Sequence, residues 1–210
     1  MTRGATEREL DKRHAFYTPL PWVLRCHMTM DKIFGLGWRE QVVWDFACGD
    51  NNMTKWSPYE FRELYRSDVE KRYDTQPDFL YDATTIDEDK MPEGLRKAIV
   101  EQKPVILFTN IPFGVVGQRV LKNFVALKKK YNARFIWACI SNGGFITHDR
   151  SGFCDNFFNV YMFAFPSTEF EGIKSKWPVF FTVWFSKRDG DPEFQYRQEQ
   201  FPCLFVEVKK

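Results

Sequence analysis

The sequence predicts an α/β fold: one domain with a mostly parallel sheet flanked by helices and an antiparallel hairpin towards the C-terminus. The chain has 210 residues, 44% of them hydrophobic, which is enough for one full core and small for two large domains. Short apolar runs alternate with helical stretches, and this alternation indicates right-handed βαβ units. The last two apolar runs have no long helix between them, which favours a hairpin at one sheet edge.

The first predicted elements are a helix and a buried strand. A Thr-Pro pair resembles an N-cap followed by a proline in the first turn, so a helix is predicted over 20–34, ending at Gly35. The apolar run at 42–46 predicts a buried strand followed by a turn rich in Gly, Asp and Asn. Pro58 interrupts the next segment, so only a short or kinked helix is expected there.

Three further strands end directly before a polar residue. These strands are predicted over 64–67, 105–109 and 134–140, and the residues that follow them are Asp68, Asn110 and Ser141. Helices are predicted over 92–102 and 118–131, and the hairpin strands over 160–165 and 178–185. Because open parallel sheets bind ligands at the carboxyl ends of their strands, the three polar residues predict a binding site at that edge.

Composition leaves the kind of partner open. The 30 basic and 28 acidic side chains give a net charge of +2, which neither requires nor excludes a nucleic acid. Aromatic residues make up 18% of the chain, and such rings serve a packed core, a stacking surface for bases, or both.

Cysteine usage and the N-terminal segment indicate a cytoplasmic protein. The five cysteines are dispersed and lack C-x-x-C spacing, which favours reduced thiols over disulfides or a zinc site. Residues 1–13 are highly charged and no later run approaches 18 apolar residues, so neither a signal peptide nor a membrane partner is expected.

The turn after the first strand is a candidate nucleotide site. It contains a single glycine, Gly49, so the G-x-G-x-x-G pattern of dinucleotide-binding proteins is absent. Asp68 ends the next strand at the spacing of a carboxylate that accepts both hydroxyls of a ribose. A plain tight turn between strand and helix explains the loop equally well.

Residues 110–113 form a candidate grip for a planar amine. The Asn110 side-chain oxygen and the next backbone carbonyl can accept two N–H bonds, while Phe113 stacks on the ring. The alternative is an ordinary turn in which Asn and Pro act locally.

Taken in order, these segments resemble the S-adenosylmethionine-dependent DNA adenine-N6 methyltransferases whose methionine-binding motif comes first. The segments that carry the resemblance are 16–19 (FYTP), 43–52 (VWDFACGDNN), 64–68 (LYRSD), 78–80 (DFL) and 110–114 (NIPFG). Residues 143–145 (GGF), 170–172 (FEG) and 176–184 (KWPVFFTVW) are similar to the closing motifs of the family. The resemblance covers residues 14–186.

The resemblance implies a Rossmann-like class I methyltransferase fold with a seven-stranded sheet, S-adenosylmethionine as cofactor, and a cofactor site assembled from several segments. It assigns the methionine end to Tyr17, Thr18 and Pro19, and the sulfonium region to Asp45, Ala47, Cys48 and Gly49, with Asn52 closing that motif. It assigns the ribose to Asp68 and the cofactor's adenine to Asp78 and Phe79.

The resemblance also implies a catalytic group and a partner. Asn110 Oδ1 and the Ile111 carbonyl accept the N–H bonds of the target amine, Pro112 fixes their geometry, and Phe113 stacks on an adenine flipped out of double-stranded DNA. The nitrogen then attacks the sulfonium methyl in line, the bond from this methyl to sulfur breaks, and S-adenosylhomocysteine is the product; no metal is required. Enzymes of this kind belong to restriction-modification systems.

Two positions depart from the family pattern. Asn51 stands where the family has a second glycine, and asparagine is the residue that best tolerates a left-handed backbone there, so the turn is expected to survive. Ile111 stands where the family has the first proline of N-P-P-F; it keeps the backbone carbonyl but is expected to lose rigidity.

The expected organisation is a charged segment over 1–13, a methyltransferase catalytic domain over 14–186 and, over 187–210, a tail or the start of a recognition region. Target recognition then comes from a longer chain, from a compact viral-type arrangement or from a separate subunit. Alternative functions are methylation of an RNA adenine or a protein glutamine, and a non-catalytic subunit that binds cofactor or DNA.

Overall fold

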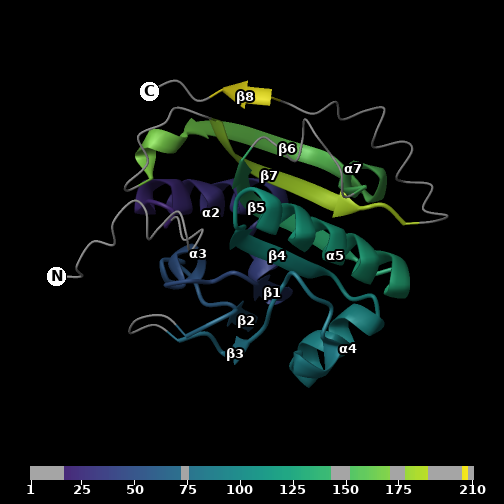
Figure 1. The fold of residues 1–210 in the computed structure, drawn as a ribbon. Coiled ribbons are helices and arrows are strands. Elements are labelled where there is room, and N and C mark those ends of the chain that lie inside the picture. The colour runs from purple at the N-terminus through teal and green to yellow at the C-terminus, as the bar shows by residue number, and fades with distance from the viewer. Residues whose placement is uncertain (1–16, 72–75, 143–151, 171–177, 189–204, 208–210) are drawn as a thin grey trace.

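The computed structural model describes residues 17–71, 76–142, 152–170, 178–188 and 205–207 (Figure 1). Its helices are α2 (Leu20–Phe34), α3 (Asn52–Lys55), α4 (Glu93–Val100), α5 (Val115–Tyr131) and α7 (Phe153–Asn156), with short 3-10 turns η1 (Leu36–Glu40), η2 (Glu88–Lys90) and η3 (Ser167–Glu169). Its strands are β1 (Val42–Asp45), β2 (Glu63–Asp68), β3 (Phe79–Leu80), β4 (Val105–Asn110), β5 (Phe135–Asn142), β6 (Phe157–Pro166), β7 (Pro178–Ser186) and β8 (Phe205–Glu207). Motif residues at 16, 143–145, 171–172 and 176–177 lie outside the described residues.

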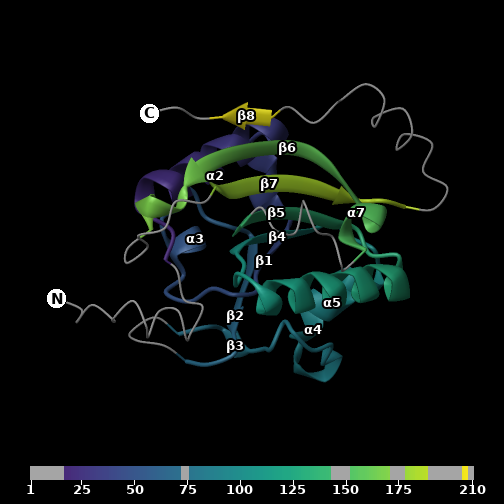
Figure 2. The same ribbon diagram turned by 45° about the horizontal axis from the view of Figure 1, so that its top comes forward.

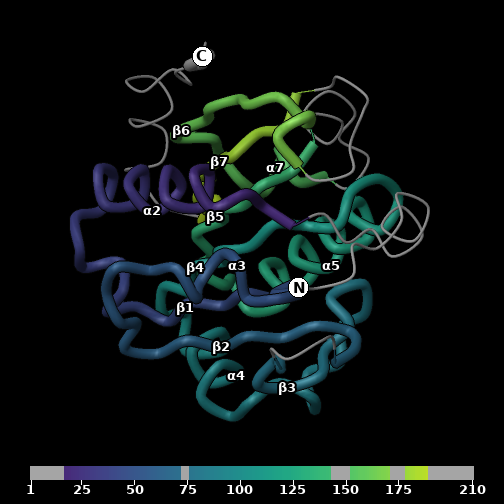
Figure 3. The backbone as a smooth tube through the Cα atoms, turned by 90° about the vertical axis from the view of Figure 1, so that its left-hand side faces the viewer, coloured from purple at the N-terminus to yellow at the C-terminus, as the bar shows by residue number. Residues whose placement is uncertain are grey.

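The strands form one sheet in the order β3-β2-β1-β4-β5-β7-β6-β8, which Figure 3 follows from β3 to β6. Strands β1 to β5 pair in parallel, and β7 runs antiparallel between β5 and β6. The predicted α/β fold with its antiparallel C-terminal pair is therefore confirmed. The sheet has one strand more than the expected seven, because the three residues of β8 pair in parallel with β6.

Helices cover both faces of the sheet (Figure 2). On the face of α4 and α5, Phe124 packs between Trp44 and Trp137, with ring centroids 5.5 and 5.6 Å away. On the face of α2 and α3, Val43 and Phe108 belong to the second buried cluster. Most of the aromatic side chains therefore pack in these two layers.

Parallel pairing brings the carboxyl ends of β1, β2 and β4 to one edge of the sheet. Trp44 is opposite both Tyr65 of β2 and Leu107 of β4, so Asp68 and Asn110, which end β2 and β4, lie at the same level on either side of the loop that follows β1. No helix within the described residues is long and apolar enough to cross a bilayer.

Candidate active site

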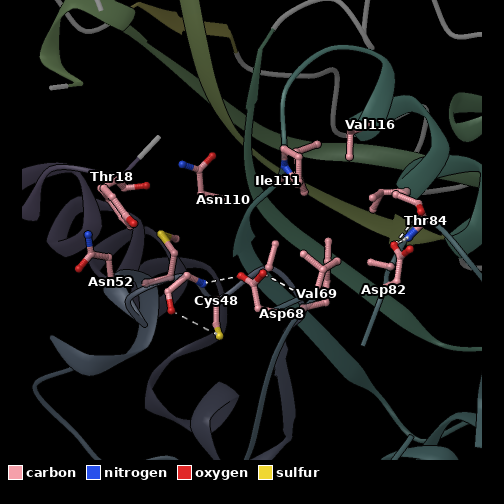
Figure 4. A pocket seen from close by; sticks show the side chains of 18 residues that line it. Thr18, Cys48, Asn52, Asp68, Val69, Asp82, Thr84, Asn110, Ile111 and Val116 are labelled. Atoms are coloured by element: carbon pink, nitrogen blue, oxygen red, sulfur yellow. Dashed lines mark hydrogen bonds between the residues drawn. The ribbon is translucent and has the colours of Figure 1, made fainter. Parts of the chain in front are cut away.

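A cavity of about 270 Å³ opens at this edge of the sheet (Figure 4). It is lined by the segment before α2, the loop between β1 and α3, the end of β2, the turn after β3, and the connection from β4 into α5. The lining residues are Tyr17, Thr18, Phe46, Ala47, Cys48, Gly49, Asn52, Met53, Asp68, Val69, Asp82, Ala83, Thr84, Asn110, Ile111, Pro112, Val116 and Val120. Five stretches far apart in sequence thus share one cavity.

Asp68 holds the loop after β1 against the end of β2. Its Oδ2 accepts a hydrogen bond from the Gly49 N–H at 2.9 Å, and its Oδ1 accepts one from the Val69 N–H at 2.8 Å. The neighbouring Cys48 N–H donates to the Ser67 carbonyl at 3.0 Å. The carboxylate is buried at the cavity wall, and these bonds fix the loop there.

The loop itself turns through two left-handed residues. Gly49 has φ 50°, and Asn51 has φ 59° and ψ 23°. Asn51 therefore adopts the left-handed conformation expected of it in place of a second glycine, and the Asn51 carbonyl accepts the first backbone bonds of α3 from Thr54 and Lys55. The turn survives the departure from the family pattern, as predicted.

Thr18 lines the end of the cavity next to α2. Only 3% of its surface is exposed, and its Oγ1 has no hydrogen-bond partner among the described residues. Tyr17 lies beside it, close enough that a side chain on Gly49 would meet its ring at 3.6 Å. Pro19 does not line the cavity; its carbonyl starts α2 by accepting from the Trp22 and Val23 N–H groups.

Asp45 lies at the end of β1, fully buried and outside the cavity lining. Neither carboxylate oxygen meets hydrogen-bond geometry with another described residue. Burial raises its pKa to about 7; the Thr109 hydroxyl opposes the rise, and the charge of Asp68 adds to it. A buried carboxyl that lacks a full set of donors favours its neutral form.

We predict that Asp45→Asn removes a pH dependence of stability. An acid whose pKa rises from 3.8 to about 7 on folding binds more protons in the folded state, so its ionisation destabilises the fold as pH climbs from about 4 to 7. Three pH units correspond to on the order of 4 kcal/mol. Asp45→Asn should match the parent near pH 4 and exceed its free energy of unfolding near pH 8, measured by urea titration. Equal differences at both pH values would contradict the buried-acid assignment.

Asn110, Ile111 and Pro112 line the cavity where β4 ends, and Phe113 does not. The Phe113 ring is buried and packs edge-on against Phe170, with centroids 6.3 Å apart. The Ile111 N–H donates to the Ile140 carbonyl at 3.0 Å, which a proline could not do. The bond extends the ladder between β4 and β5 by one residue, so it replaces part of the rigidity that the departure from proline was expected to remove.

Gly117 lets the first turn of α5 lie directly on Pro112. A Cβ at this glycine would stand 2.3 Å from the Pro112 carbonyl oxygen, a backbone atom that cannot move aside cheaply. We predict that Gly117→Ala lowers the free energy of unfolding by about 1–3 kcal/mol, measured by denaturant titration. Gly37→Ala is the matched control, because nothing lies within 4 Å of a Cβ there. An equal effect of both substitutions would contradict the contact.

Asp78 and Phe79, expected at the cofactor's adenine, lie outside the cavity lining. Asp78 forms an ion pair with Arg66, its Oδ1 accepting from Nη2 at 2.8 Å, and its N–H donates to the Arg66 carbonyl. It therefore sits beside the middle of β2, short of the carboxyl edge. Phe79 stacks on Trp44 at 6.5 Å.

The turn after β3 supplies cavity residues that the sequence prediction missed. Asp82, Ala83 and Thr84 line the wall, and Asp82 Oδ1 accepts bonds from the N–H and hydroxyl of Thr84 at 2.8 and 2.7 Å. The signal that could have found them is an acidic residue two positions after the D-F-L segment over 78–80, because β3 itself is too short to show a strand pattern.

A buried polar network supports the cavity floor from α2. His27 Nε2 donates to the Met53 carbonyl of α3 at 2.8 Å, and Met53 lines the cavity. Burial lowers the pKa of His27 to about 4, so the imidazole is neutral at physiological pH. Arg39, also buried, is ion-paired with Asp31 of α2 and reaches His27 Nδ1 at 3.4 Å. The network ties α3 to α2.

In the described part of the chain, no group of three or more His, Cys, Asp or Glu side chains is placed to hold a metal ion. Cys48 lines the cavity, but burial and then the nearby charge of Asp45 raise the pKa of its thiol well above the ordinary range. A thiol of this kind stays protonated and is a poor nucleophile.

Comparison with known proteins supplies no family for this chain. No family model matches the chain, and no curated protein matches it. A crystal structure from Listeria monocytogenes, described provisionally as a class I S-adenosylmethionine-dependent methyltransferase, aligns with 100% of this chain and 68% of its own length. Its TM-score is 0.47 and its sequence identity 11%.

Proposed function

We propose that the chain is an S-adenosylmethionine-dependent methyltransferase that modifies N6 of an adenine flipped out of double-stranded DNA. The observation that carries the proposal is the convergence of Thr18, Gly49, Asp68 and Asn110 on one cavity at the carboxyl edge of a parallel sheet. These residues come from four separate motifs that lie far apart in the sequence, and they supply a hydroxyl, a backbone turn, a carboxylate and an amide to the same cavity.

The cavity residues fit the cofactor in a definite order. Thr18 and Asn52 lie at one end, Cys48, Asn110 and Asp68 in the middle, and Ile111, Val116, Asp82 and Thr84 at the other end (Figure 4). The hydroxyl of Thr18, buried without a partner among the described residues, suits the polar methionine end. When bound, S-adenosylmethionine supplies an electrophilic methyl group on a sulfonium.

The middle and the far end suit the nucleoside half of the cofactor. Asp68 is placed to accept from the ribose hydroxyls while its bonds to Gly49 and Val69 keep it in position. At the far end Ile111, Ala83 and Val116 offer apolar contacts to a flat ring, and Asp82 offers an acceptor for an exocyclic amine. We therefore assign the adenine end to the turn after β3 in preference to Asp78 and Phe79.

Asn110 and Ile111 are proposed to prepare the acceptor amine. Its lone pair is delocalised into the base, so two acceptors on its N–H bonds favour the tetrahedral, nucleophilic nitrogen. The side-chain oxygen Oδ1 of Asn110 is one acceptor, and the backbone carbonyl of Ile111 is the other. The hydrogen bond from the Ile111 N–H to the Ile140 carbonyl holds both acceptors in position. Pro112, pressed against Gly117, limits movement of the same segment.

Base stacking is proposed for Phe113 together with Phe170. Their rings meet edge-on in the buried cluster next to the cavity. For Phe113 to stack on a flipped adenine, its ring must turn from Phe170 towards the cavity, which opens a slot between the two rings.

We propose further that target recognition is supplied by another domain or subunit.

Transfer of labelled methyl groups from S-adenosylmethionine to unmethylated double-stranded DNA tests the function. We expect label in N6-methyladenine of the digested DNA. Single-stranded RNA and a glutamine-containing peptide are parallel acceptors, and label in either of them but not in DNA would overturn the DNA assignment while keeping methyl transfer. Cofactor binding without transfer to any acceptor would indicate a non-catalytic subunit.

A further inference from the structure

A second cavity, of about 390 Å³, lies at the opposite end of the sheet from the candidate active site. Pro104 and Arg134, which precede β4 and β5, are part of its wall, so it opens at the amino ends of these strands. Among the described residues, it shares no lining residue with the first cavity. A ligand bound there would therefore be distinct from the cofactor and the acceptor proposed above.

The apolar wall of this cavity is aromatic. Phe34, Phe158 and Phe185 are all half-buried, and Phe185 lies between the other two with centroids 5.7 and 5.4 Å away. Trp38 and Ile136, which belong to the same buried layer as Phe34 and Phe185, also line the cavity. Half-buried rings that face a cavity offer flat surface to a planar ligand, which gains both apolar burial and ring contact.

Two guanidinium groups complete the lining, and none of the described residues that line the cavity is acidic. Arg134 is exposed and has no ion-pair partner among the described residues. Arg188 donates to the Gln102 side-chain oxygen at 3.0 Å, which is a neutral partner. Arginines on a cavity wall suit a carboxylate or phosphate, which they bind through paired N–H donors.

We propose that this second cavity binds a small aromatic anion. Its planar ring packs against Phe34, Phe158 and Phe185, and its carboxylate or phosphate accepts hydrogen bonds from Arg134 and Arg188. The ligand chemistry is thus one flat ring carrying one anionic group, and an aromatic acid and a nucleoside monophosphate both satisfy it.

Titration calorimetry with two anions and their neutral counterparts tests the proposal. The anions are 2-naphthoate and adenosine 5′-monophosphate, and the counterparts are 2-naphthylmethanol and adenosine. We expect saturable binding of at least one anion and at least about tenfold weaker binding of its counterpart, because hydrogen bonds to a charged group are lost. Binding of naphthoate alone identifies an aromatic acid, and binding of the monophosphate alone identifies a nucleotide.

Variants assign the binding to this cavity. The double variant Arg134→Gln and Arg188→Gln should weaken binding of the anion by at least about tenfold. The control Arg96→Gln, which replaces an exposed arginine of α4 outside the lining, should leave binding unchanged. Asp68→Asn, which alters the candidate active site, should leave binding unchanged. The proposal is overturned if neither anion binds, if the neutral counterparts bind equally well, or if Asp68→Asn abolishes binding that the arginine variant retains. Thermal unfolding of each variant checks that it is folded.

Discussion

Asn110→Ala should reduce the rate of methyl transfer by a factor of about 100 to 1,000 and leave the affinity for S-adenosylmethionine within a few fold of the parent. The substitution removes one of the two acceptors that prepare the amine, and it leaves Gly49 and Asp68 in place at the centre of the cavity. A loss confined to the chemical step is the signature of a group that acts on the reacting nitrogen.

Single-turnover kinetics measure the rate of methyl transfer, and titration with S-adenosylmethionine measures its affinity separately. Asn159→Ala is the control, because Asn159 is a half-buried asparagine at the irregularity of β6, away from the cavity. Asn110→Gln keeps the amide but moves it by one methylene, and it should be almost as slow as the alanine variant. A rate of methyl transfer by Asn110→Ala close to that of the parent would contradict the role of Asn110 as an acceptor for the amine.

Asp68→Ala should weaken binding of the cofactor by a factor of at least about 100. The carboxylate accepts the Gly49 and Val69 N–H bonds, so its removal both frees the loop after β1 and deletes the proposed ribose acceptor. Two backbone donors lose a buried partner, and the free energy of unfolding should fall by about 2–4 kcal/mol.

A graded series of substitutions at Asp68 separates its effect on the loop after β1 from its effect on ribose binding. Asp68→Asn retains one acceptor oxygen and should lie between the parent and Asp68→Ala in both cofactor affinity and stability. Glu101→Ala is the acidic control, because Glu101 is exposed and pairs only with lysines at the surface. Titration calorimetry and urea unfolding give the two quantities, and parental affinity in Asp68→Ala would exclude its proposed role.

The elements with strong periodic patterns were predictable from the sequence, and the reason is local. The helix over 20–34 has a proline before it and a glycine after it, and the structure ends α2 at the same residues. The helix predicted from 118 begins earlier, at Val115, because Gly114 at φ 72° can begin it directly after Pro112 and Phe113. The strand β3 was missed because two residues carry no period.

The candidate site was predictable where a motif coincides with the end of a strand. Asp68 and Asn110 end β2 and β4, and parallel pairing alone carries both to the cavity. Asp78 was assigned from a three-letter match, yet its pairing with Arg66 places it two residues short of the edge, and Asp82 takes the cavity position instead. The burial of Phe113 depends on Phe170, a tertiary contact that no local pattern reports.

The cofactor cavity is tested most directly by titrating S-adenosylhomocysteine into the purified chain, since this ligand fills the same site and does not react. We expect one binding site per chain, saturable in the micromolar range, and a loss of at least about 100-fold in Asp68→Ala but not in Asn110→Ala. No heat of binding in the parent, or equal binding in Asp68→Ala, would contradict the assignment of the cavity at the ends of β1, β2 and β4 to this cofactor.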